Sequence, residues 1–191
     1  AQCLVGSEMC IRDSNIVDGD DRMTTGYSER PEYVFGFNGG FSYKGFNFSM
    51  QWSGATHVNK MLQVEYRIPF TNAGKRGLLD YFYKQGWTEE NQLGAKYPRA
   101  AETSETWNSE NSTLWLKDAS YIRLKTLTIG YTFTNKRFLK AIGAKSLGLS
   151  LNGYNLLTFS PLDILDPESL GNNVGAYPLV KVYSVGVNLN F

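Results

Sequence analysis

The final stretch of the chain, residues 183–191, alternates apolar and polar side chains without a break and ends on the aromatic Phe191. A repeat of two places successive side chains on opposite faces of a β-strand, so this strand would have one apolar and one polar face. A strand of a soluble β-sandwich can show the same alternation, because antiparallel sheets often bury only one face. The segment therefore predicts a strand, and the rest of the chain must decide its surroundings.

Four further segments repeat this alternation. In each of them one face collects aromatic and aliphatic side chains, and the other collects mainly Ser, Thr, Asn and Gly. Lys44-Gly45 separates the first two segments as a tight turn, which predicts a hairpin. The predicted strands are 33–43, 46–55, 126–134, 147–157 and 182–191.

Charge is absent from these segments, although 19% of all residues are charged. A face of small neutral polar groups suits a wet or plugged lumen, and the opposite face suits lipid. Each segment has about the ten residues that a tilted strand needs to cross the hydrocarbon layer. A membrane-spanning helix is excluded, because no run of about eighteen apolar residues occurs and the mean hydropathy is negative. The pattern predicts an all-β fold, with antiparallel strands of a transmembrane outer-membrane β-barrel.

The number of predicted strands indicates a fragment. Five strands cannot close a barrel, and an open sheet edge would leave unsatisfied amides in lipid. We therefore expect residues 15–191 to be the C-terminal part of a much larger barrel. Residues 1–14 show no periodicity and look like translated adapter or vector sequence; the alternative is a genuine extension with a reactive Cys3 or Cys10. Because both cysteines lie there, no disulfide or thiol-metal site can be argued elsewhere.

The connections between the predicted strands fall into two size classes. The turn at 44–45 and the link 134–146 are short, whereas 55–120 and 158–177 are long. Outer-membrane barrels have short periplasmic turns and long external loops. This predicts a periplasmic C-terminus, with both long segments outside the cell.

Smaller elements are expected within the connections. Alternation over 62–70 predicts an additional strand, and 77–85 could be a helix that stops at Gly86. The basic link 135–143 could include a short helical turn, with its charges most simply exposed to solvent.

With these features in view, the chain resembles the C-terminal part of the TonB-linked outer-membrane receptors of the SusC/RagA family found in Bacteroidetes. The resemblance spans nearly everything after about residue 15, and the ordered set of segments carries it rather than any single one. These segments are Asp20-Asp21-Arg22, Gly26, Pro31, Phe35-Gly36-Phe37, Tyr43-Lys44-Gly45-Phe46, Trp87-Thr88-Glu89-Glu90-Asn91, Pro98-Arg99, Asp118–Lys125, Gly130-Tyr131, Asn152–Thr158, Leu165–Glu168, Tyr177-Pro178 and Tyr183-Ser184.

The resemblance implies the last strands of a plugged barrel of about 22 strands. It implies import of large nutrients, most often oligosaccharides or other glycans and in some members peptides. A SusD-like surface lipoprotein would act as a lid, and the TonB-ExbB-ExbD complex would act through the absent upstream region. The implied location is the outer membrane, with a periplasmic C-terminus.

Composition and motifs argue against several other classes of function. The net charge of +1 includes no polybasic stretch that would suggest nucleic acid. His57 is the single histidine, and no metal-ligand spacing or nucleophile–base set is visible, so we expect no enzyme, no cofactor and no metal. Asp166 and Glu168 could form a Ca²⁺-type oxygen pair, although Asp-Pro-Glu more often marks a turn.

Candidate contacts to substrate or lid are aromatic residues of the long external segment, because flat amphipathic rings stack on sugars and anchor interfaces. The alternative is that these rings pack the loop or sit in an aromatic girdle. Arg123 and Lys125, at the mouth end of the third predicted strand, are expected to be interfacial or lumenal. The candidate aromatic residues are Trp87, Tyr97, Trp107 and Trp115.

Phe191, with Leu189 and Val187 on the same face, resembles the signal that the bacterial barrel-assembly machinery reads. Two alternatives to a transporter remain open from the sequence. A passive porin or structural outer-membrane barrel would have the same strands. A soluble β-sandwich glycan-binding module would also be rich in aromatic residues, but it leaves the uncharged faces unexplained.

Overall fold

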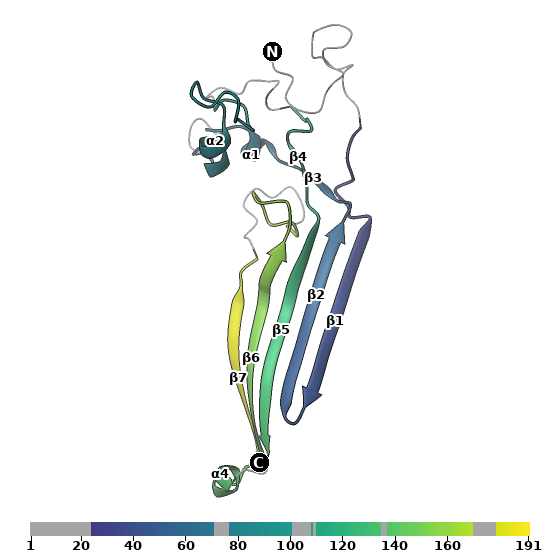
Figure 1. The fold of residues 1–191 in the computed structure, drawn as a ribbon, viewed down its shortest axis with the longest axis vertical. Coiled ribbons are helices and arrows are strands. Elements are labelled where there is room, and N and C mark those ends of the chain that lie inside the picture. Colours follow the sequence, from purple (N-terminus) through teal and green to yellow (C-terminus); the bar gives the residue numbers. More distant parts are fainter. Residues whose placement is uncertain (1–23, 71–76, 101–107, 109, 135–136, 170–178) are drawn as a thin grey trace. The chain divides into compact units, whose positions relative to one another are not determined.

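The computed structural model describes residues 24–70, 77–100, 108, 110–134, 137–169 and 179–191. The chain divides into two compact units (Figure 1). Unit 1 comprises residues up to 30, 58–118 and 169–176, and unit 2 comprises 31–57, 119–168 and 177–191. Residues 1–14 lie outside the described residues.

Unit 2 is a five-stranded antiparallel sheet with the order β1-β2-β5-β6-β7 (Figure 1). The five predicted strands are confirmed, although β5 and β6 are longer than predicted. Within the described residues, β1 and β7 form the edges of the sheet. The strand bounds are β1 Tyr33–Tyr43, β2 Phe46–Thr56, β5 Tyr121–Thr134, β6 Ser146–Phe159 and β7 Val182–Asn190.

The turn that joins β1 and β2 has the predicted form. Lys44 and Gly45 both have positive φ, at 47° and 89°, as in the mirror-image turns that match the twist of a hairpin. A Cβ on Gly45 would stand 2.6 Å from the carbonyl oxygen of Thr132. The same glycine accepts a 2.7 Å hydrogen bond from Thr132 N, so the turn also docks against β5. Only glycine satisfies both the backbone angle and the available space.

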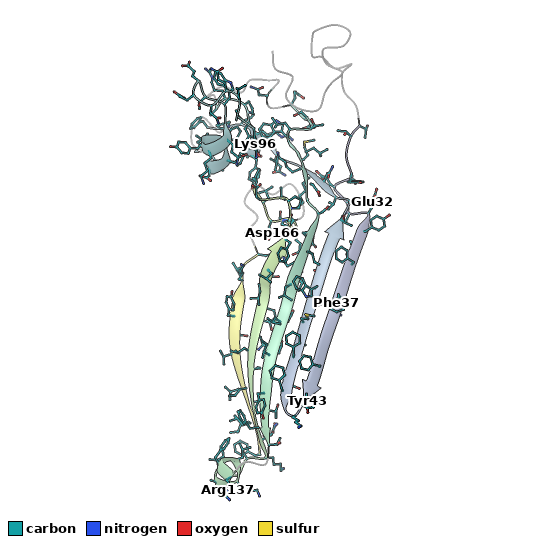
Figure 2. All side chains as sticks on the ribbon, in the orientation of Figure 1. Glu32, Phe37, Tyr43, Lys96, Arg137 and Asp166 are labelled. Atoms are coloured by element: carbon teal, nitrogen blue, oxygen red, sulfur yellow. The ribbon has the colours of Figure 1, made fainter. Side chains whose placement is uncertain are left out.

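The register keeps apolar side chains together across all five strands. We call the resulting surfaces the aromatic face and the polar face, and Figure 2 shows Phe37 and Tyr43 on β1, both of which belong to the aromatic face. One complete row of the aromatic face is Phe41, Phe48, Ile129, Leu151 and Val185, and the adjacent row of the polar face is Gly40, Ser49, Thr128, Asn152 and Ser184.

A bulge at Lys125 corrects the alternation of β5. Gln51 pairs with Thr126 but Trp52 pairs with Leu124, so Lys125 is the extra residue. A bulge of this kind shifts the two-residue repeat by one position. As a result Leu124 stays on the aromatic face beside Trp52, and Arg123 falls on the polar face opposite Ser53.

Unit 1 contains short elements rather than a long strand. The pair β3 Asn59–Met61 and β4 Leu116–Asp118 forms a small antiparallel ladder. Helix α2, Asp80–Gln85, ends before Gly86 as predicted.

The strand predicted over 62–70 is wrong, because Val64–Arg67 forms the helical turn α1. Ile68 N donates a 2.9 Å hydrogen bond to Val64 O, a local bond that replaces a ladder bond. Pro69 follows and has no amide to donate to a neighbouring strand.

The predicted helical turn after β5 is present as α4, Arg137–Ala141. Among the described residues, every helix is too short or too polar to cross a membrane.

Candidate functional site

The two faces of the unit 2 sheet present different chemistry. Large side chains of the aromatic face are exposed, including Phe37 at 56% and Val185 at 74%. Nothing among the described residues packs over them. The polar face carries small neutral residues, and the charged residues of the five strands are Arg123 and Lys125 on β5.

Arg123 is the centre of a buried ion network at one end of this sheet, and only 3% of its side chain is exposed. Its Nη1 lies 2.5 Å from Glu168 Oε2. Its Nη2 donates to both carboxylate oxygens of Asp166, at 2.8 and 2.9 Å. Such charge-assisted and partly bidentate bonds are the strong class of hydrogen bond.

Lys125 and Tyr121 complete the network around Glu168. Lys125 Nζ lies 2.6 and 2.7 Å from the two oxygens of the Glu168 carboxylate. The Tyr121 hydroxyl donates to Glu168 Oε1 at 2.9 Å. The formal charges of Arg123 and Lys125 therefore balance those of Asp166 and Glu168, which reduces the cost of burying them.

The two carboxylates come from the loop 160–169 that follows β6, which we call the Asp166 loop; Figure 2 labels Asp166 beyond the end of that strand. Ser160 Oγ donates to Ser120 O at 2.8 Å, and Leu162 is buried. Glu168 N donates to Asp166 Oδ1 at 2.9 Å, which closes an Asx-type turn. These contacts fasten the loop to the start of β5.

The turn expected at Asp166-Pro167-Glu168 is confirmed. The carboxylates of Asp166 and Glu168 face cations of the protein itself, so the network already uses the oxygens that a calcium ion would need. Among the described residues, no group of three or more His, Cys, Asp or Glu side chains could hold a metal ion.

Two buried polar atoms beside the network have no hydrogen-bond partner among the described residues, Arg123 Nε and Ser53 Oγ. Ser53 on β2 and Arg123 on β5 are register partners in the sheet. Because one N–H of the buried guanidinium is unpaired within the described part of the chain, the stability of buried Arg123 depends more strongly on its bonds to Asp166 and Glu168.

The candidate contact residues of unit 1 have different environments. Trp115 and Tyr97 are buried, at 0% and 7% exposure, and their rings stack at 5.8 Å between centroids. They pack with Phe82 and Tyr81 as one aromatic cluster. Trp115 Nε1 donates to Asn108 O at 2.8 Å, so its polar edge is satisfied inside the unit. In this conformation both residues take the packing role that the sequence left open.

Trp87 is half-buried, and Trp107 lies outside the described residues. Contact of Trp87 with substrate or lid stays a prediction. Two further large side chains of unit 1, Tyr83 and Leu93, were not singled out from the sequence and are exposed at 78% and 100%. Tyr83 follows the buried Phe82 on helix α2. Neighbouring residues of a helix point in different directions, so a helix that buries Phe82 would be expected to expose Tyr83.

Burial perturbs two titratable groups of unit 1. Desolvation raises the pKa of the Tyr81 phenol, and the neighbouring Tyr97 and Tyr66 raise it further. The Tyr81 hydroxyl donates to Tyr66 O, so it is held neutral as a structural donor. Desolvation also lowers the pKa of Arg67, against the opposing effect of Glu110. Arg67 donates to Leu62 O and to Asn111 Oδ1, which ties α1 to the loop before β4.

His57 is partly exposed beside Glu32 at the open end of the β1–β2 hairpin. Its Nδ1 lies 2.9 Å from Glu32 Oε2. Both side chains are substantially exposed, so this pair contributes little stability.

The chain is similar to two curated proteins of Formosa agariphila. It is 32% identical over 190 residues to TonB-dependent receptor P26, which covers 92% of this chain and 18% of the relative. It is 27% identical over 174 residues to TonB-dependent receptor P3, which covers 84% of this chain and 16% of the relative. The chain thus spans less than one fifth of the length of these relatives. No protein-family model matches it.

Two solved structures are similar in fold to most of this chain. The structure of the RagAB peptide transporter aligns with 93% of this chain and 19% of that chain, with a TM-score of 0.70 and 25% identity. The RagAB peptide importer in the "open-open" state aligns with 98% of this chain and 20% of that chain, with a TM-score of 0.70 and 24% identity. The antiparallel sheet therefore corresponds to part of that transporter.

Proposed function

Because the chain corresponds to a small part of a TonB-dependent receptor of the SusC/RagA type, we propose that its sheet is a section of the barrel wall of an outer-membrane importer. The observation that carries this proposal is the division of one sheet into two faces. Exposed aromatic and aliphatic side chains cover one face, and mainly small uncharged residues cover the other, where Arg123 lies at one end with its charge paired. Lipid suits the first face, and a lumen occupied by water or a plug suits the second.

We base the proposed number of barrel strands and the side of the membrane assigned to each connection on the sequence. Residues 15–191 would supply the last strands of a barrel of about 22 strands, with the remaining strands upstream. The short connections 44–45 and 135–145 would be periplasmic together with the C-terminus, and unit 1 would belong to an external segment. The ion network of Arg123 would then fasten the Asp166 loop at the external rim of the lumen.

Transport requires partners that this chain does not contain. A SusD-like surface lipoprotein would close the external side, and TonB-ExbB-ExbD would drive import through the upstream plug. The half-buried Trp87 and the exposed Tyr83 of unit 1 are the proposed contacts to lid or substrate on the described surface. The family consists of non-enzymatic transporters, so the proposed role of this section is mechanical.

The proposed substrate is an oligomeric nutrient. Glycan import is the expectation that the sequence resemblance raised. The solved relative is described as a peptide transporter, and this specific observation favours peptides as the second candidate. Both substrates are too large for passive diffusion through a narrow pore and would need an energised gate.

Energy dependence separates this proposal from a passive porin. Cells that express the complete receptor should accumulate fluorescent oligosaccharides or peptides, and an uncoupler of the proton-motive force should reduce uptake to the level of receptor-free cells. A passive barrel would keep its uptake after the uncoupler is added. That result would overturn the transporter assignment while leaving the barrel assignment intact.

A soluble sandwich is the weaker alternative. It requires a second sheet or helix over the apolar face, and among the described residues Phe37 and Phe41 have no such cover. Exposing a whole face of large apolar side chains to water would be costly.

Assembly provides a prediction about Phe191. Deleting Phe191 from the complete receptor should reduce the amount of surface-exposed protein, because its ring continues the apolar row of Val187 and Leu189 that the barrel-assembly machinery would read. Surface labelling of intact cells measures the loss. Phe191→Tyr keeps the aromatic ring and should assemble normally; parental levels after the deletion would contradict the signal.

A further inference from the structure

We infer that residues 137–145, which we call the α4 segment, contact the anionic headgroups of the phospholipid leaflet at that end of the barrel. This inference rests on the proposed function, since it requires the sheet to lie in a membrane. It assigns a membrane-binding role to a link whose charges the sequence explained as a solvated turn.

The α4 segment is fixed in position yet leaves large apolar side chains uncovered. Leu139 and Ala144 are buried at 1% and 7% exposure, and Ala144 N donates to Leu139 O at 2.9 Å. Phe138 and Ile142, one helical turn apart, are exposed at 49% and 55%. Phe138 and Ile142 are therefore exposed because α4 packs by its other side, through Leu139 and Ala144.

The uncovered side chains continue the aromatic face. The Phe138 ring lies 6.4 Å, between centroids, from the ring of Phe133. Phe133 itself belongs to the aromatic face, where it pairs with Leu147 and neighbours Tyr131 at 4.6 Å. If that face meets lipid, Phe138 meets the same medium where the strand ends.

The polar side chains of the α4 segment are Arg137, Lys140 and Lys145, all of them basic. Lys145 Nζ donates to Phe191 O at 3.0 Å. Arg137 and Lys140 are exposed, and within the described part of the chain neither has an ion-pair partner. The segment contains no Asp or Glu. Long basic side chains can lie along apolar surface while the charge reaches a phosphate, and anionic headgroups attract them.

The β1–β2 turn, at the same end of the sheet, also combines an exposed aromatic ring with a basic side chain. Tyr43, at the end of β1, is exposed at 65%, and Lys44 Nζ lies 5.2 Å from the centre of its ring. The hydrogen bond from Thr132 N to Gly45 O fixes this turn beside the end of β5. Figure 2 shows Tyr43 and Arg137 at the same end of the sheet, opposite the end that carries Asp166. Both the β1–β2 turn and the α4 segment therefore combine aromatic rings with cations at the end of the sheet where headgroups would lie.

Depth-dependent fluorescence quenching tests this inference in the complete receptor, with its other cysteines replaced by serine. A bimane label would be attached to Phe138→Cys or Ile142→Cys, and the receptor would be placed in phosphatidylcholine vesicles that contain lipid brominated near the headgroup. Both labels should be quenched. A label at Thr134→Cys, on the polar face next to Phe133, is the matched control and should not be.

A label at Ile129→Cys, within the aromatic face, tests the membrane position of the sheet separately from headgroup contact of the α4 segment. With lipid brominated deep in its acyl chains, this label should be quenched. If it is quenched while those at 138 and 142 are not, the α4 inference is overturned and the proposed function stands. If the Ile129 label also escapes quenching, the membrane assignment fails and the inference fails with it.

The charge requirement has its own readout. Adding phosphatidylglycerol should increase the quenching at Phe138→Cys, because each basic residue near an anionic surface favours contact by about fivefold. The double change Arg137→Gln and Lys140→Gln should clearly reduce this increase, with Lys145 and Lys44 left in place. Lys96→Gln with Arg99→Gln removes the same charge from exposed positions of unit 1 and should leave it intact. An increase that is undiminished after loss of Arg137 and Lys140 would contradict headgroup binding.

Discussion

Neutralising both acids of the Arg123 network, with Asp166→Asn and Glu168→Gln, should destabilise the complete receptor by about 3–5 kcal/mol. The cost arises because Arg123 would stay buried, with 3% of its side chain exposed, after losing both carboxylates. Its Nε already lacks a partner among the described residues. Urea unfolding of the receptor in lipid vesicles, followed by tryptophan fluorescence, measures the change.

Asp163→Asn is the matched control for this experiment, because Asp163 lies in the same loop and is exposed. It should change stability by less than about 0.5 kcal/mol. Lys125→Gln should cost less than loss of the acids, since 30% of the Lys125 side chain is exposed and water can replace it. If the double neutralisation cost no more than Asp163→Asn, the network would have no role in holding the loop.

Ile129→Arg should cost about 2–4 kcal/mol of barrel stability, the range for a cation at the bilayer midplane. Ile129 lies between Phe48 and Leu151 in a row of the aromatic face. Thr128→Arg should cost much less, because Thr128 lies between Ser49 and Asn152 on the polar face, where a guanidinium can reach water or plug carboxylates.

Folding titrations of the two variants into lipid vesicles compare these costs directly. The residues are adjacent in sequence and lie at the same depth, so only the face differs. Equal penalties, or a larger one at Thr128, would mean that the register or the membrane assignment is wrong.

The strands of unit 2 could be predicted because their determinants are local. Alternation marks each strand, and Lys44-Gly45 marks its turn by the backbone angles that it must adopt. The strand itself shows a break in alternation at Lys125-Thr126, but the pairing of Leu124 with Trp52 and Leu157 is needed to identify this break as a bulge.

The ion network depends on a contact between residues far apart in the sequence. Asp166 and Glu168 lie more than forty positions from Arg123, and a short Asp-Pro-Glu segment does not reveal which cation it will meet. The break in alternation around Lys125 was the one local signal that this part of β5 differs from the rest.

Unit 1 was the least predictable part, because short elements and aromatic side chains are ambiguous in sequence. A tryptophan suits a ligand contact and a core equally well, and burial alone distinguishes Trp115 from the exposed Tyr83. The alternation over 62–70 satisfied the pattern of a strand, but the bond between Ile68 and Val64 and the presence of Pro69 favoured a helical turn.

In the proposed importer, one face of this sheet meets lipid and the other does not. Nitroxide side chains introduced singly along residues 35–42 of β1 in the membrane-embedded receptor report this through collisions with oxygen, which concentrates in lipid, and with a water-soluble nickel chelate. Oxygen accessibility should alternate with a period of two, high at Phe35, Phe37 and Phe41 and low at Asn38 and Ser42. A uniform profile, or maxima at Asn38 and Ser42, would contradict it.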